Sequence, residues 1–433
     1  MSQIEYNIST KRIEIYVEET DKELKDAYYK RLRDISYNSY RYANDIVNKQ
    51  YFKDLLKIGI GNADNSITPT ELRERLDTVI ESSEMNFGYK YTSAELKHAL
   101  PSYVRSAVNN VVFKNYNSDK KDVLRGDKSI RNYRRNSSVS FVIKGLVGLK
   151  KAEGKDFRFQ LLSTPMKTKL GRDRSNNEAI FDAILSGRFL MCDSQFQFKN
   201  DKLYLLLTIK TPKEKVKIDK NKTLGVDLGI NIPIYVAVND GLSSKGFGTK
   251  DELFAKKQQF QNRKRSLQHN LSIAKGGKGR NKKLKKLDDV KDSEKNYTKT
   301  YIDTITKAVI NYAVSNKIGV ITLEDLSSVK EHANEVVLRN WNIYDIQQKI
   351  KYKSANIGIE VVMVDPAYSS QRCYKCGSIH KDNRPTQETF KCIKCGHEDN
   401  ADRNAAKNLS IANTEKYKIE IKKHKDSVKK ESE

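Results

Sequence analysis

The chain begins with a regular alternation of apolar and polar residues. In residues 4–17, IEYNISTKRIEIYV, apolar and polar side chains alternate, which predicts a β-strand with one buried face. Apolar residues then recur at steps of three and four, which predicts helix over most of residues 21–117. The positions that define the start of this second pattern are Leu24, Tyr28, Leu32, Ile35, Ala43, Ile46 and Val47.

Two capping signals divide the helical region. Thr68 precedes a proline and is followed three residues later by Glu71, which is the pattern of an N-terminal capping box. Thr92 and Glu95 repeat this spacing. Pro101 then separates that helix from the helical stretch SYVRSAVNNVVFKNY, so we expect several helices rather than one.

From residue 137 the pattern changes to short strands. The stretches SVSFVIK, FRFQLL, GRFLMCD, SQFQFK and KLYLLLTIK are rich in β-branched and aromatic residues and have polar breaks between them. Together with the N-terminal strand they predict a small β-barrel, which the helical region interrupts.

A third region, from residue 216, combines strands and helices. TLGVDLGINIPIYVAVNDGLSSKGFG predicts three strands, and we expect long helices at 250–273 and 294–316 with a flexible basic connector, GGKGRNKKLKK, between them. A strand (GVITLEDL), a helix, a strand (IEVVMVD) and a last helix follow, which is the element order of an RNase H-like α/β fold. We expect the charged stretch from Thr414 to be frayed.

The charge of the chain indicates a polyanionic partner. The 433 residues contain 81 Lys and Arg against 55 Asp and Glu, a formal net charge of +26, and the basic residues are distributed throughout. Such an excess concentrates nucleic acid around a protein. The apolar stretches are too short for a membrane span, and the first residues lack the apolar core of a signal peptide. We therefore expect a cytoplasmic protein without a membrane partner.

Four of the five cysteines form two Cys-x-x-Cys pairs, each followed by glycine, with fifteen residues between the pairs. Zinc takes four tetrahedral ligands, and this spacing is typical of a zinc ribbon, whereas a redox dithiol would need only one pair. The predicted ligands are Cys373, Cys376, Cys392 and Cys395. His380 and His397 are superfluous beside four thiolates, and we interpret them as surface residues.

Asp227 is the first candidate catalytic acid. It lies within the apolar strand LGVDLGI, where alternation places Gly225, Asp227 and Gly229 on one face. Aspartate is a poor strand former, and the flanking glycines would leave room for a metal ion and a phosphodiester. The alternative is a solvated aspartate in a β-bulge.

Glu324 and Asp325 end the buried strand GVITLEDL. Ligands in open α/β sheets gather at the carboxyl ends of strands, so acids at this position are candidates for the same site. The two side chains point to opposite faces, and at most one can join Asp227. Periodicity does not choose between them, and capping of the following loop is the alternative for both.

Three more acids occur in CGHEDNADRNAAKNL, after the second cysteine pair. If a helix begins near residue 400, Asp402 shares a face with two alanines and a leucine, and we expect this face to be buried and Asn404 and Asn408 to be exposed. Glu398 and Asp399 precede the helix, where acids interact favourably with its dipole. Asp402 is therefore the catalytic candidate and Asp399 the predicted cap.

These motifs resemble the RuvC nuclease domain of TnpB proteins and type V CRISPR effectors. The matching pieces are GVDLGI, ITLEDL, AYSSQRCYKCG with CIKCG, and DRNAAKN, and ALPSYVRSAVNNVVFKNY resembles the helical segment in the N-terminal half of these proteins. The resemblance implies a catalytic triad of Asp227, Glu324 and Asp402 that holds two Mg²⁺ or Mn²⁺ ions. It also implies one structural Zn²⁺ on the four cysteines.

The resemblance further implies a multidomain α+β protein. The implied parts are a wedge-like β-barrel (1–20 and 137–215), a helical recognition lobe (21–136), a RuvC-like RNase H-like nuclease domain (216–370 and 397–412), an inserted zinc ribbon (371–396) and a charged tail (413–433). The implied function is that of an RNA-guided DNA endonuclease of prokaryotes. Its partners would be a guide RNA and double-stranded target DNA, which form an RNA–DNA heteroduplex beside a short protein-read motif.

Several alternatives stay open. The short length and the stretch KSIRNYRRNSSVSF favour the miniature V-F subtype, which implies a homodimer on one guide RNA. The lack of an additional N-terminal cysteine cluster leaves open the transposon-encoded TnpB form, which implies a monomer. A guided protein that binds without cleaving would lack one of the acids, and a strand-transferring transposase would leave joined strands.

The stretch AYYKRLRDISYNSYRYAND interleaves tyrosines with basic residues. Tyrosine can stack on bases, and arginine can pair with phosphates. We expect Tyr28 to pack in a core and Arg31, Arg33 and Arg41 to contact nucleic acid. The alternative is that these arginines are merely solvated.

Overall fold

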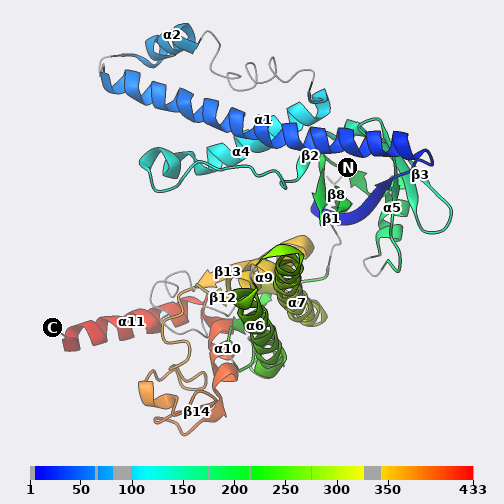
Figure 1. Cartoon of the computed structure of the whole chain (residues 1–433). Helices are drawn as coiled ribbons and strands as arrows, with labels where there is room; N and C mark the ends of the chain where they lie inside the picture. The colour runs from blue at the N-terminus through cyan, green and yellow to red at the C-terminus, as the bar shows by residue number, and fades with distance from the viewer. Residues whose placement is uncertain are drawn as a thin grey trace. The chain divides into compact units, whose positions relative to one another are not determined.

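The structure is a computed structural model that describes residues 5–63, 67–80, 99–173, 176–213, 216–229, 231–274, 276–325 and 343–432. The chain divides into two compact units, Met1–Lys213 and Glu214–Glu433 (Figure 1). The predicted capping box of Thr92 and Glu95 lies outside the described residues. None of the helices within the described ranges is both long enough and apolar enough to cross a membrane.

The first unit is built on an antiparallel sheet of order β2-β7-β8-β1-β5-β4-β3, with β6 paired to β8. The strands are β1 (Tyr6–Val17), β2 (Val139–Phe141), β3 (Leu146–Lys151), β4 (Phe157–Leu161), β5 (Thr164–Thr168), β6 (Leu190–Met191), β7 (Ser194–Lys199) and β8 (Lys202–Pro212). Alternate residues of β1, such as Ile13, Ile15 and Val17, are buried, as predicted. In the described residues the pairing starts at β2 and ends at β3, so the ladder does not form the complete ring expected of a barrel.

The helices of the first unit are α1 (Lys22–Ala63), α2 (Pro69–Ile80), α4 (Ser102–Arg125) and α5 (Asn177–Leu185). Helix α1 contacts α4, and buried residues of both join the strands in one core. Tyr28 packs against this core, as expected. The capping box at the start of α2 is confirmed, because the backbone N–H of Glu71 donates to Thr68 Oγ1 at 3.3 Å and that of Thr68 donates to Glu71 Oε2 at 2.8 Å.

The second unit contains a five-stranded mixed sheet of order β11-β10-β9-β12-β13. Strand β10 is antiparallel to β9 and β11, whereas β12 is parallel to β9 and β13. The strands are β9 (Asp219–Asp227), β10 (Ile234–Val238), β11 (Ser244–Phe247), β12 (Ile318–Glu324) and β13 (Glu360–Val364). The cysteine-rich segment adds a hairpin of β14 (Thr389–Lys391) and β15 (Glu398–Asn400).

Helices cover both faces of the five-stranded sheet. On one face, α7 (Gly277–Ser315) and α9 (Ile343–Ile357) share a core with strand residues that include Val226 and Leu323. On the other face, the neighbouring Gly225 and Thr322 contact α10 (Ala401–Ile411). Because side chains alternate along a strand, the residues two positions further on, Asp227 in β9 and Glu324 in β12, also face α10. Helix α6 (Lys250–Ile273) packs along α7.

Two segments that we expected to be irregular are helical. The basic stretch GGKGRNKKLKK forms the start of α7 rather than a flexible connector, because lysine and arginine are good helix formers and its glycines lie at the N-cap and in the first turn. The charged stretch from Thr414 forms α11 (Glu415–Ser432), in which Tyr417 and Ile421 are buried one turn apart. Both predictions were wrong, because high charge concealed good helix propensity and a narrow apolar face.

Candidate active site and metal centre

Three acids from separate segments meet at one edge of the five-stranded sheet. Asp227 is the last residue of β9, and Glu324 is the last residue of β12. These strands are parallel neighbours, with Val226 paired to Leu323, so their carboxyl ends coincide. Asp402 lies in the first turn of α10, which packs on β9. We had expected Asp227 to lie within its strand. It is instead the last residue of β9, so that prediction was wrong.

The space beside Gly225 is occupied by helix α10. A Cβ atom at Gly225 would lie 2.1 Å from the carbonyl oxygen of Ala406, so only glycine allows the helix to lie this close to β9. The hydroxyl of Thr322 donates to a backbone carbonyl of α10 at 2.6 Å and fixes the same contact. The prediction that Gly225 makes room for a metal ion is wrong. Gly229 does lie on the acidic side, because a Cβ atom there would be 3.5 Å from Asp402 Oδ2.

Helix α10 begins near residue 400, as predicted, but its cap differs from the expected one. The side chain of Asn400 accepts a hydrogen bond from the backbone N–H of Arg403 at 3.0 Å. Asp399, the predicted cap, precedes the N-cap position, and its enclosed carboxylate forms ion pairs with Arg403 and Lys407. Asp399 thus joins β15 to the side of α10 that carries Arg403 and Lys407.

The side of α10 away from the sheet is also buried. Asn404 and Asn408 have no exposed surface, so the prediction that they face solvent is wrong. The amide of Asn404 donates to the carbonyl of Arg372, and that of Asn408 donates to the carbonyls of Arg372 and Ser369. These asparagines meet polar backbone of the segment before the cysteines, which hydropathy alone does not reveal. Helix α10 is held between the sheet and this segment.

The local environment raises the pKa values of all three carboxyl groups. Burial, followed by the charges of Glu324 and Asp402, raises the pKa of Asp227 well above its usual value. Burial also raises the pKa of Glu324 against a hydrogen bond from Ser369, and that of Asp402 against the charge of Arg384. A divalent cation would offset both the repulsion and the burial of these carboxylates.

Arg384 is a site residue that the sequence analysis missed. It follows a short 3₁₀ turn, Lys381–Asn383, and its guanidinium Nη2 lies 3.8 Å from Asp402 Oδ1 with 28% of the side chain exposed. Its positive charge opposes the rise in the pKa values of Asp227, Glu324 and Asp402 but does not cancel it. No periodicity or spacing distinguishes it, because it belongs to an irregular loop. A partly exposed guanidinium beside carboxylates is well placed to contact a phosphate group.

The structure favours Glu324 over Asp325 as the acid of β12. Glu324 is buried and faces α10, whereas Asp325 is exposed beyond the end of the strand. Ser369 Oγ donates to Glu324 Oε1 at 2.6 Å, and the side chain of Gln347 donates to the Glu324 carbonyl at 2.8 Å. Both the backbone and the carboxylate of Glu324 are therefore held in place.

The four cysteines gather into a compact cluster. Their sulfur atoms all lie within 4.8 Å of one another, with 3.8 Å between Cys373 and Cys395 and 3.6 Å between Cys376 and Cys392. The glycine after each pair has a left-handed φ, 77° or 68°, and donates its N–H to the first cysteine carbonyl of that pair. Four thiolates about 2.3 Å from one zinc ion lie about 3.8 Å apart in a tetrahedron, so the cluster fits zinc.

The acidic site is less compact than the cysteine cluster. Within the described ranges, the four cysteines form a group of candidate ligand side chains close enough to surround one ion, whereas the three acids do not. The three carboxylates are spaced more widely, and they offer the hard oxygen ligands that Mg²⁺ prefers. Their chemistry fits ions that also keep water or substrate oxygens as ligands.

The three basic residues proposed for nucleic-acid contact lie on the exposed side of α1. Arg31, Arg33 and Arg41 are all exposed. Arg33 lies over the ring of Tyr29, with 5.9 Å between the guanidinium carbon and the ring centroid, and Arg41 lies over Tyr37 at 5.5 Å. These aromatic contacts hold two of the guanidinium groups at the surface, and the proposed contact with nucleic acid stays a prediction.

Comparisons with known proteins agree with these features. A protein-family model described as "Cas12f1-like, TNB domain" matches residues 344–409. A protein of Sulfoacidibacillus thermotolerans named "CRISPR-associated endodeoxyribonuclease Cas12f1" is 33% identical over 313 residues, which cover 68% of this chain and 73% of the relative. The chain belongs to the Cas12f1 family.

Two further similarities agree with membership of the Cas12f1 family. A protein of the same name from Syntrophomonas palmitatica is 31% identical over 234 residues, which cover 52% of this chain and 47% of the relative. The solved "Cas12f1-sgRNA-target DNA complex" is similar in fold, with a TM-score of 0.67 at 19% identity over 94% of this chain and 99% of that one. The expected resemblance to miniature V-F proteins is thereby confirmed.

Proposed function

We propose that this member of the Cas12f1 family is an RNA-guided DNA endonuclease that cleaves at the site of Asp227, Glu324 and Asp402. The observation that carries the proposal is the convergence of these acids and Arg384 at the end of β9 and β12. The relatives from Sulfoacidibacillus thermotolerans and Syntrophomonas palmitatica are named endodeoxyribonucleases, and one solved structure of similar fold is a complex with sgRNA and target DNA.

We assign a RuvC-like nuclease domain to residues 216–370 and 397–412, with a zinc ribbon at 371–396. The sheet order β11-β10-β9-β12-β13, in which two antiparallel pairings are followed by two parallel ones, is that of an RNase H-like fold and supports this assignment. Helix α11 belongs with this unit, because Tyr417 is buried against it. Residues 1–20 and 137–215 would form the wedge, and 21–136 the recognition lobe.

The proposed chemistry is hydrolysis of a phosphodiester with two Mg²⁺ or Mn²⁺ ions. Such ions, when bound, activate the attacking water and stabilise the leaving oxygen. Asp227 and Glu324 present their carboxylates from the ends of packed strands, and Asp402 presents its carboxylate from α10. Arg384 would stabilise the negative charge that develops on the phosphate. We expect products with a 5′-phosphate and a 3′-hydroxyl.

The proposed partners are a guide RNA and double-stranded DNA in a prokaryotic cytoplasm. Arg31, Arg33 and Arg41 are our proposed RNA contacts. Replacing all three with alanine should lower RNA affinity. It should also reduce the slope of log affinity against log salt concentration by about 0.7–0.9 for each phosphate contact that is lost. Unchanged binding across salt would refute these contacts. The proposed assembly is a homodimer on one guide RNA. The mass of the protein–RNA complex, measured by light scattering, tests this proposal.

The decisive test compares cleavage and guided binding in the same variant. Asp227→Ala should abolish cleavage of guide-matched DNA and retain binding to it, because the carboxylate is needed for the metal and not for base pairing. Asp325→Asn is the matched control, since it changes an exposed acid at the end of the same site's second strand. Undiminished cleavage by Asp227→Ala would refute the assignment. Joined strands from the unaltered chain would identify a strand-transferring transposase, and binding without cleavage would identify a guided binding protein.

A further inference from the structure

A buried polar network connects the carboxylate of Glu324 to the rest of the second unit. Its first member is Ser369, which is 4% exposed and lies in the loop after β13. Ser369 Oγ lies 2.6 Å from Glu324 Oε1 and 3.1 Å from the carbonyl oxygen of Pro366. A hydroxyl has one hydrogen, and an ionised carboxylate is the stronger acceptor at the shorter distance. Ser369 therefore donates to Glu324 when that acid is charged.

The second member, Asn408 of α10, holds the loop of Ser369. Its amide nitrogen donates to the carbonyls of Ser369 at 2.9 Å and Arg372 at 2.6 Å, and its side-chain oxygen accepts from Arg372 Nη1 at 2.8 Å. Both hydrogens of the amide are thus used, in a position without exposed surface. The same helix carries Asp402, so one element orients two of the proposed catalytic acids, one directly and one through Ser369.

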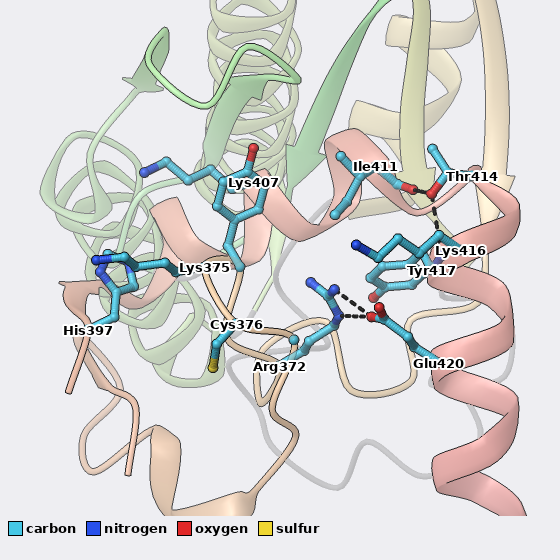
Figure 2. A pocket seen from close by; sticks show the side chains of 12 residues that line it. Arg372, Lys375, Cys376, His397, Lys407, Ile411, Thr414, Lys416, Tyr417 and Glu420 are labelled. Atoms are coloured by element: carbon cyan, nitrogen blue, oxygen red, sulfur yellow. Dashed lines mark hydrogen bonds and ion pairs between the residues drawn. The ribbon is translucent and has the colours of Figure 1, made fainter. Parts of the chain in front are cut away.

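The last members join this loop to helix α11. Figure 2 shows the guanidinium of Arg372 turned toward Glu420, which accepts from Arg372 Nε at 3.1 Å and from Nη2 at 2.6 Å. Arg372 also lies over the ring of Tyr417, with 5.1 Å between the guanidinium carbon and the ring centroid. Arg372 is 4% exposed, whereas 31% of the Glu420 side chain is exposed, so the buried guanidinium is held in place by Glu420 and Tyr417.

We infer that Ser369 is a positioning residue for Glu324, and that α11 keeps Ser369 in place through Glu420 and Arg372. The inference rests on the proposed function, because it concerns the same metal site. The terminal torsion of a glutamate side chain is soft, so the plane of its carboxylate needs an external partner. Hydrogen bonds to metal-binding carboxylates orient them, and their loss typically weakens metal affinity about 10-fold to 100-fold.

A purely structural role for the network predicts a different result. If these contacts only attach the loop and α11 to α10, removing the Ser369 hydroxyl should lower the unfolding temperature and leave metal affinity unchanged. Metal affinity in the absence of nucleic acid therefore separates orientation of Glu324 from general stabilisation, without depending on cleavage.

The experiment is a Mn²⁺ titration of the full, zinc-loaded, RNA-free chain, followed by electron paramagnetic resonance. Mn²⁺ binding at the acidic site is defined as the part of the total Mn²⁺ binding that is lost in Asp227→Ala. Ser369→Ala should weaken this part about tenfold or more. The matched control is Ser410→Ala, which removes another buried serine hydroxyl, one that donates to the Lys407 carbonyl within its own helix. This control should bind Mn²⁺ as the unaltered chain does.

A second pair of variants tests the part played by α11. Glu420→Ala should weaken Mn²⁺ binding in the same direction but by less than Ser369→Ala, and Glu420→Gln, which keeps an acceptor for Arg372, should restore part of the loss. Unaltered affinity in Ser369→Ala would overturn the inference while leaving the proposed function intact. Absence of Asp227-dependent Mn²⁺ binding in the unaltered chain would overturn both.

Discussion

The cysteine cluster and the acidic site are both suited to metal ions, but they are built in opposite ways. The four sulfurs come from one short segment, and their positions follow from two tight turns. The three acids come from β9, β12 and α10, and they meet only because two parallel strands end together and a helix packs across them. A compact site can therefore be recognised from spacing, whereas a distributed site requires the topology.

The two sites are nevertheless connected through the ribbon. Arg384 belongs to the cysteine-rich segment, yet its guanidinium lies 3.8 Å from Asp402. Asn383, which has no exposed surface, links the two turns by donating to the Ser378 carbonyl and accepting from the Ile393 N–H. The folding of the ribbon around its cysteines thus determines where Arg384 lies. The connection between the two sites can therefore be tested by changing either the cysteines or Arg384.

The largest expected effect comes from breaking the cysteine cluster. Structural zinc contributes about 10–16 kcal/mol to the folding of small zinc domains, so Cys392→Ser should unfold the ribbon, displace Arg384 and abolish cleavage. Zinc content, limited proteolysis and cleavage of the same sample measure the three effects. Cys192→Ser, at the half-buried cysteine outside the cluster, should change none of them. Normal cleavage by a chain that holds no zinc would show that the two sites are independent.

Removing only the arginine should have a smaller effect. Arg384→Ala should lower the single-turnover cleavage rate about 100-fold to 1,000-fold, the usual loss for one group that stabilises transition-state charge, with zinc content unchanged. Arg384→Lys should recover part of this loss because the charge returns without the planar geometry. Lys381→Ala, at an exposed position in the preceding 3₁₀ turn, is the control. An unchanged rate in Arg384→Ala would restrict the ribbon to a structural role.

The smallest expected effect concerns stability without a divalent ion at the acidic site. The folded-state pKa of Asp227 is raised, so its contribution to stability is complete below its unfolded pKa of about 3.9 and is lost as pH rises through the raised value. In Mg²⁺-free buffer at neutral pH, Asp227→Asn should therefore raise the unfolding temperature of the second unit, because the neutral amide avoids the cost of a buried charge.

Calorimetry at several pH values measures this effect. The gain should disappear near pH 4, where the carboxyl group of the unaltered chain is already neutral. Equal unfolding temperatures at neutral pH would show that burial of the Asp227 carboxylate and its repulsion by Glu324 and Asp402 cost too little to require a cation.

Much of the distributed site could be predicted from the sequence, for identifiable reasons. An acid in an apolar strand is informative because it opposes strand propensity, and this selected Asp227 and the pair that contains Glu324. The face shared with small residues selected Asp402, because only such a face can lie against a glycine in a sheet. The choice of Glu324 over its neighbour came from the resemblance, and the burial of Glu324 supports it.

Other features could not be predicted because they depend on contacts between distant segments. Asn404 and Asn408 look like solvated residues, but they bind the backbone before the cysteines. Gly225 looks like space for a metal ion, but it makes space for α10. Arg384 lies in a loop whose path depends on the cysteine cluster. In each case the local pattern correctly gave the polarity or size of the side chain. The residues that it contacts depend on tertiary packing, which the local pattern does not contain.

The central claim is that the acid of α10 acts in chemistry while its neighbour acts in folding, and one paired measurement tests it. Cleavage rates and unfolding temperatures are compared for Asp402→Asn and Asp399→Asn with the same guide and target. We predict that Asp402→Asn lowers cleavage at least about 1,000-fold, about 4 kcal/mol, and retains the fold. Asp399→Asn should lower the unfolding temperature, because Arg403 and Lys407 lose their partner, and should retain cleavage. Full cleavage by Asp402→Asn, or loss of cleavage confined to Asp399→Asn, would contradict the account.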